Sequence, residues 1–133
     1  MRVRLHDTLG DMSERTLLVV DAANVVGSVP DGWWRDRHGA AERLRDRLAA
    51  RAERDGGCGD EEVVLVVEGA AREVASVPGV RVVAAGGSGD DRIVELVAAE
   101  GRGRRCVVVT ADRELRARVA ALGAEVAGPR SVR

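Results

Sequence analysis

The chain has 133 residues, which suits one domain with its own apolar core and leaves little room for a second. It is 45% hydrophobic and 32% charged, and no apolar run approaches the roughly 20 residues of a membrane span. The formal net charge of -1 argues against a uniformly basic nucleic-acid binder, although a local rim of arginines remains compatible with it. We therefore expect one cytoplasmic globular domain that does not contact a membrane.

The cysteines and histidines form no recognisable disulfide or zinc pattern. Cys58 lies in a glycine-rich segment and Cys106 opens an apolar run, while His6 and His38 have no partner at zinc-site spacing. Carboxylates are therefore the remaining candidates for metal binding.

In chain order, residues 1–14 are polar and aperiodic, which predicts a flexible N-terminal arm before a domain at 15–133. Continuous apolar runs, typical of strands buried on both faces, then recur along the chain. They predict strands at 16–21, 63–67, 80–84, 106–110 and, more weakly, 124–127.

Helical patterns separate these runs. The longest predicted helix spans 34–54, with one apolar stripe, and a shorter one spans 70–76. Two further helices are predicted from these stripes: Ile93, Val94, Leu96 and Val97; and Leu115, Val119 and Leu122, ended by Gly123. Alternation of strands and helices indicates an α/β fold, a parallel sheet covered on both faces.

Acidic side chains come directly after the predicted strands, where parallel sheets place their ligand sites. They are Asp21, Glu68 and Asp112, with Asp90 and Asp91 at the start of a helix. Crowded carboxylates repel one another unless a cation neutralises them, and Mg²⁺ or Mn²⁺ prefers such oxygen ligands. Metal-dependent phosphodiester hydrolysis is the chemistry that this pattern favours. Asn24 could orient a carboxylate or a water.

Each acid also has a structural interpretation. Asp21 and Asn24 could form a turn, Asp112 could cap the following helix, and Glu68 could be a solvated strand end. Ser88 could cap a helix in which Asp91 occupies the third position.

Arginines and a tryptophan near the same edge are candidates for RNA contacts. The arginines are Arg35, Arg37, Arg72, Arg92 and Arg113, each of which could equally be an ordinary surface partner of an acid. Trp34 continues the helical stripe and is expected in the core, so Trp33 is the better candidate for stacking on a base.

Three segments together resemble the acidic motifs of PIN-like nucleases, and the most similar branch is the NYN type that includes the YacP-like proteins. They are 18–27 (LVVDAANVVG), 89–93 (GDDRI) and 109–115 (VTADREL). The resemblance implies a three-layer α/β/α sandwich with a five-stranded parallel sheet in the order 3-2-1-4-5. Gly89 departs mildly from the family, where alanine is common.

The resemblance also implies an activity, which is cleavage of single-stranded RNA by metal-activated water. The expected partner is single-stranded or structured RNA. Asp21, Asp90 and Asp112 would bind Mg²⁺ or Mn²⁺ directly or through water, with Asn24 supporting the site. Asp91 would be a further or outer ligand, and Glu68 stands where relatives often have Asp. A homodimer is left open.

Two other functions remain open. The same acids could serve a nucleotide phosphohydrolase of the NTP pyrophosphohydrolase type, although no glycine-rich loop follows the first strand. Alternatively, the domain could be a noncatalytic module that binds RNA or another partner.

Overall fold

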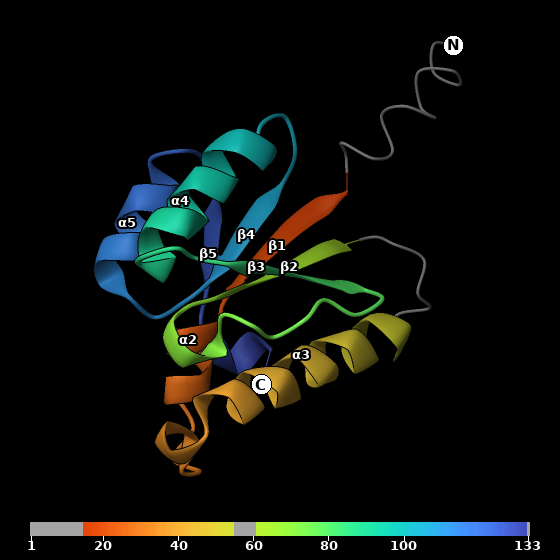
Figure 1. Ribbon diagram of the computed structural model, residues 1–133. Helices are drawn as coiled ribbons and strands as arrows, with labels where there is room; N and C mark the ends of the chain where they lie inside the picture. The colour runs from red at the N-terminus through yellow and green to blue at the C-terminus, as the bar shows by residue number, and fades with distance from the viewer. Residues whose placement is uncertain (1–14, 55–60, 133) are drawn as a thin grey trace.

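The computed structural model describes residues 15–54 and 61–132, and the predicted arm at 1–14 lies outside these residues (Figure 1). Five strands form one parallel sheet in the order β3-β2-β1-β4-β5. The strands are β1 (Thr16–Asp21), β2 (Glu61–Val67), β3 (Val80–Ala84), β4 (Cys106–Val109) and β5 (Glu125–Ala127). This confirms the predicted sheet, including its strand order.

Helices cover both faces of the sheet, so the three-layer prediction is also confirmed (Figure 1). The α-helices are α2 (Ala22–Gly27), α3 (Arg37–Arg54), α4 (Gly89–Glu100) and α5 (Arg113–Ala120). Short 3₁₀ helices lie at Trp33–Arg35, Gly69–Ala71 and Pro129–Ser131. Among the described residues, no helix combines the length and apolarity that a membrane span requires.

Side-chain alternation along the central strand builds two separate cores. Leu18 and Val20 of β1 pack toward α2 and α3, whereas Leu17 and Val19 pack toward α4 and α5. A strand buried on both faces has no polar face, which explains why β1 appears in the sequence as an unbroken apolar run.

The long helix starts later than predicted, and Trp34 is not a core residue. Asp36 caps α3, since its carboxylate accepts a hydrogen bond of 2.9 Å from the Gly39 N–H. The helix therefore begins at Arg37, and Trp34 belongs to the preceding 3₁₀ turn, where the residue is 54% exposed. The stripe holds for the rest of the helix, where Ala41, Leu44 and Leu48 are buried; Ala52, at its far end, is only partly buried.

The short helix predicted at 70–76 is absent from the structure. Gly69 adopts a left-handed φ of 59° and begins a short 3₁₀ turn, Gly69–Ala71. Pro78 disfavours helical backbone at the preceding residue, which instead pairs with Val80 in an isolated antiparallel bridge. Between these two points the chain forms only the 3₁₀ turn and no α-helix.

The last predicted helix is also shorter than its stripe. It ends at Ala120, so Leu122 lies beyond the helix and is 48% exposed. Gly123 follows with a φ of 93°, in agreement with its predicted role in ending the helical segment.

Candidate functional site

The carboxyl ends of β1 and β4 mark the point where the chain leaves the sheet in opposite directions. After β1 it continues into α2 on one face, and after β4 into α5 on the other (Figure 1). Parallel sheets bind ligands at such switch points because the diverging connections leave a crevice between them. Asp21 ends β1 and Asp112 follows β4 by three residues, so both acids lie at this crevice.

A buried hydroxyl joins these two acids. The Thr110 Oγ1 donates a hydrogen bond of 2.9 Å to Asp21 Oδ2 and accepts one of 3.1 Å from the Asp112 N–H. Thr110 is fully buried and Asp21 is only 5% exposed. Thr110 is not among the predicted site residues. The sequence feature that could have identified it is a hydroxyl side chain two residues before an aspartate, a spacing at which the hydroxyl can bond to the backbone in a turn.

Asn24 ties the two connections together. Its N–H donates a 3.4 Å hydrogen bond to Asp21 Oδ1, and its own Oδ1 accepts one of 2.8 Å from the Ala111 N–H. The turn interpretation of Asp21 and Asn24 is thus correct as local structure. The same contacts hold the Asp21 carboxylate at the crevice, as expected of a supporting amide.

Glu68 is held against the start of α4. Its Oε1 accepts a hydrogen bond of 3.0 Å from the Gly89 N–H. A Cβ atom on residue 89 would lie only 2.8 Å from Glu68 Oε2, so a larger residue at position 89 would displace the end of the Glu68 side chain. Glu68 is therefore a partly buried member of the acidic edge, and not merely a solvated strand end.

The acids are close enough to perturb one another. The pKa of Asp21 is raised from 3.8 to about 6, chiefly by burial and also by the negative charges of Asp90 and Glu68, against the opposing hydrogen bonds from Thr110 and Asn24. The pKa of Asp90 is also raised, first by burial and then by the charges of Asp112 and Glu68. The structure thus brings Asp21, Glu68, Asp90 and Asp112 into one electrostatically coupled group. We refer to these four residues as the acidic cluster.

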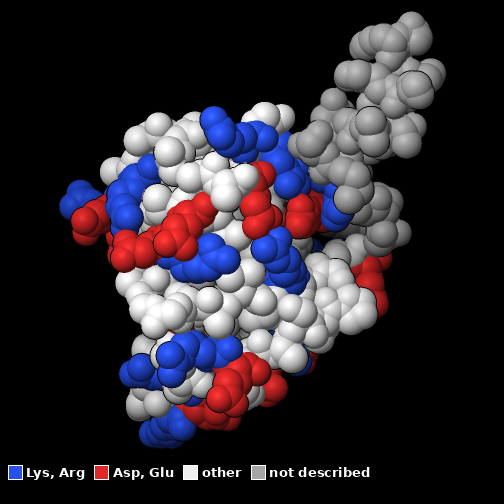
Figure 2. Space-filling view, turned by 45° about the horizontal axis from the view of Figure 1, so that its top comes forward, with Lys and Arg blue, Asp and Glu red and all other residues white. Residues whose placement is uncertain are grey.

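Acids at the opposite edge of the sheet are neutralised by arginines. Three glutamates there form ion pairs of 2.8 to 3.1 Å: Glu100 with Arg81, Glu62 with Arg104, and Glu125 with Arg105. Figure 2 likewise shows basic and acidic side chains interleaved on the face that it presents. Among the described residues, no arginine lies within ion-pair distance of the acidic cluster. The acidic cluster therefore has no direct ion-pair partner among these residues, although the charge of Arg118 partly offsets the rise in the pKa of Asp90.

Asp21 and Asp112 serve as helix caps as well, of α2 and α5, whereas α4 is capped by Ser88. Asp112 Oδ1 accepts a 2.9 Å hydrogen bond from the Leu115 N–H at the start of α5. The Asp91 N–H donates to Ser88 Oγ at 3.3 Å, while the exposed Asp91 carboxylate pairs with Arg118 at 3.1 Å. The capping interpretation of Ser88 and Asp112 is confirmed, and Asp91 has a basic partner that the acidic cluster lacks.

The proposed RNA-binding arginines differ in what they contact. Arg92 pairs with Glu95 at 3.4 Å, and Arg72 donates to the Gly69 carbonyl oxygen at 3.2 Å. Arg113, at the start of α5, is exposed. Arg35 lies over the Trp34 ring at 5.6 Å, and Arg37 over the Trp33 ring at 5.5 Å.

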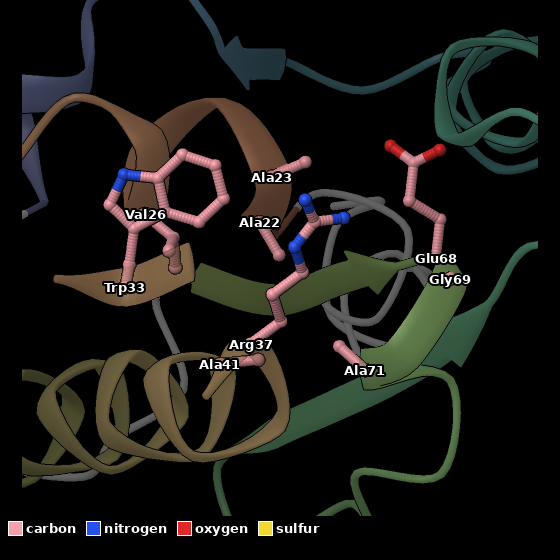
Figure 3. A pocket seen from close by; sticks show the side chains of 9 residues that line it. All are labelled: Ala22, Ala23, Val26, Trp33, Arg37, Ala41, Glu68, Gly69 and Ala71. Atoms are coloured by element: carbon pink, nitrogen blue, oxygen red, sulfur yellow. The ribbon is translucent and has the colours of Figure 1, made fainter. Parts of the chain in front are cut away.

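A cavity of about 270 Å³ adjoins the acidic cluster (Figure 3). Its lining residues are Ala22, Ala23, Val26, Trp33, Arg37, Ala41, Glu68, Gly69 and Ala71. Trp33 and Arg37, two of the predicted RNA contacts, thus share one cavity with Glu68.

The donor set of the acidic cluster suits a hard divalent cation, since it offers carboxylate oxygens whose mutual repulsion a cation would relieve. Within residues 15–54 and 61–132, however, no group of three or more His, Cys, Asp or Glu side chains is already arranged to hold a metal ion. Ligation at this site therefore requires side-chain movement or bridging water, both of which Mg²⁺ sites commonly use.

No family model matches the chain, and neither does any curated protein. The chain is similar in structure to Rae1 (YacP) from Bacillus subtilis, solved as a W164L mutant, with a TM-score of 0.67 and 21% sequence identity. The match covers 86% of this chain and 69% of that one. The chain therefore has a PIN-like fold, and the resemblance of its motifs to the YacP-like branch is confirmed at the level of the fold.

Proposed function

We propose that the protein is a metal-dependent endoribonuclease that hydrolyses phosphodiester bonds of single-stranded RNA. The observation that carries this proposal is the acidic cluster. Four carboxylates lie together without arginine partners at the switch point of a PIN-like sheet, and the pKa values of two of them are raised. Such perturbed groups in a crevice are typical of functional sites. The resemblance of the three acidic motifs to PIN-like nucleases agrees with it.

In this proposal Asp21, Asp90 and Asp112 hold Mg²⁺ or Mn²⁺, with Glu68 beside them. The ion would supply an acidified water and stabilise charge on the phosphoryl group. The chain's own part is to position the carboxylates. Thr110 and Asn24 fix the Asp21 carboxylate, and the cap on α5 fixes Asp112. Repulsion among these acids raises the affinity of the site for a cation.

We expect purified protein to cut end-labelled single-stranded RNA in Mg²⁺ or Mn²⁺ and not in EDTA. Asp90→Asn should lower the rate by at least about 100-fold, since it removes one charge from the cation site. Asp46→Asn is the matched control, because Asp46 is exposed on α3 and pairs only with its neighbour Arg45. Cutting by Asp90→Asn at the wild-type rate would contradict the proposal.

The same incubations, repeated with nucleoside triphosphates in place of RNA and with a measurement of RNA binding, test the two other functions. A phosphohydrolase would release phosphate or pyrophosphate from nucleoside triphosphates, yet β1 runs directly into α2 without the glycine-rich loop that cradles phosphates in such enzymes. A noncatalytic module would bind RNA and leave it intact in either metal ion.

A further inference from the structure

We propose that the cavity beside the acidic cluster binds one unpaired nucleobase of the RNA, next to the phosphate that is cleaved. We call this cavity the base pocket. The identification of the cleaved phosphate rests on the proposed function, whereas binding of the base does not.

The size and lining of the base pocket fit a single flat ring system. Its volume of about 270 Å³ lies just below the range of roughly 300–1,000 Å³ that is usual for drug-sized ligands. Five small or medium apolar side chains form most of the lining: Ala22, Ala23, Val26, Ala41 and Ala71. They leave open space beside the larger indole of Trp33.

Trp33 and Arg37 supply the two features that a base requires. An indole offers a face on which any base can stack, and a guanidinium donates to base acceptors or to phosphate oxygens. The Arg37 guanidinium carbon already lies 5.5 Å from the centre of the Trp33 ring. In the view of Figure 3, the guanidinium lies between the indole and the Glu68 carboxylate.

The position of the base pocket links binding to cleavage. Glu68 lines the pocket and belongs to the acidic cluster, and Ala22 and Ala23 directly follow Asp21. A base in the pocket would therefore bring its own phosphate to the crevice. A base within a duplex is stacked on both faces and cannot enter, which predicts selectivity for single strands.

Trp33 and Trp34 are the two tryptophans of the chain, so single-tryptophan variants report on the pocket separately. In EDTA, where metal-dependent cleavage is absent, a short single-stranded RNA should quench the fluorescence of Trp34→Phe, which retains Trp33. The same RNA should leave Trp33→Phe largely unquenched, because Trp34 is exposed outside the pocket. A duplex of the same sequence, and an abasic strand with the same phosphates, should both quench at least tenfold less.

A pocket-filling variant provides the second measurement. Ala23 is exposed on α2 and lines the pocket, so Ala23→Leu should occupy the space without disturbing the core and weaken RNA binding at least tenfold. Ala98→Leu, at an exposed position of α4, is the matched control and should bind as the wild type does.

The results separate the two proposals. Quenching of Trp33 without cleavage in Mg²⁺ or Mn²⁺ would support the base pocket and overturn the nuclease. Cleavage by the wild type, with no quenching of Trp33 and unchanged binding by Ala23→Leu, would overturn the base pocket alone. Equal quenching by the abasic strand would overturn it too, since phosphate contacts would then explain the binding.

Discussion

Asp21→Asn is expected to make the protein more stable at pH 7 while lowering RNA cleavage by at least about 1,000-fold. Asp21 is almost fully buried, and burial raises its pKa from 3.8 to about 6. Each pKa unit corresponds to about 1.4 kcal/mol, so ionised Asp21 destabilises the folded state by about 3 kcal/mol at pH 7. An Asn side chain has no charge to desolvate, and it can still bond to the Thr110 hydroxyl.

The stability difference between Asp21→Asn and the wild type should depend on pH. Because the pKa is higher in the folded state, the unfolded chain ionises first as pH rises, and stability is lost between about pH 4 and pH 6. Urea unfolding in EDTA should therefore show Asp21→Asn to be about 1–3 kcal/mol more stable at pH 7 and nearly equal to the wild type at pH 4. A variant less stable than the wild type at pH 7 would show that the carboxylate is a structural group.

Asp112→Asn should separate the two roles of Asp112, which are to cap α5 and, in the proposed function, to hold the metal ion. Asn caps helices about as well as Asp, so the free energy of unfolding should change by less than about 1 kcal/mol. Cleavage should nevertheless fall by at least about 1,000-fold, because the charge beside Asp90 is lost.

Asp112→Ala is the companion variant. It should lose both cleavage and the hydrogen bond to Leu115, with about 1 kcal/mol less stability than Asp112→Asn. Cleavage that survives in Asp112→Asn and fails only in an unfolded Asp112→Ala would make Asp112 a cap and nothing more.

The fold could be predicted because strands buried on both faces leave a direct pattern in the sequence. The run at 16–21 is apolar up to Asp21, and the structure explains this by the two cores that β1 separates. The prediction that Trp34 lies in the core as part of the long helix is wrong, because periodicity alone does not mark where a helix begins. The start of the helix is set instead by Asp36, which caps it through the Gly39 N–H three residues later, although the apolar stripe extends back to Trp34.

For the site, the sequence could predict only that acids at the carboxyl ends of neighbouring parallel strands lie close together. That Asp21 and Asp112 meet follows from parallel strands, yet the hydroxyl that joins them belongs to Thr110, which resembles an ordinary strand residue. The contact between Glu68 and Gly89 joins segments 21 residues apart, and only the packed structure shows it. The base pocket likewise depends on space left by small side chains, which no motif records.

A crystal soaked in Mn²⁺ would show whether the acidic cluster binds a metal ion, because the anomalous signal locates the metal independently of activity. We expect one peak at the crevice between β1 and β4, within reach of Asp21, Asp90 and Asp112 directly or through one water. Its occupancy should fall sharply in Asp90→Asn crystals. A fully soaked crystal with no peak at that crevice, or with a peak that Asp90→Asn leaves unchanged, would contradict a metal-dependent nuclease built on these acids.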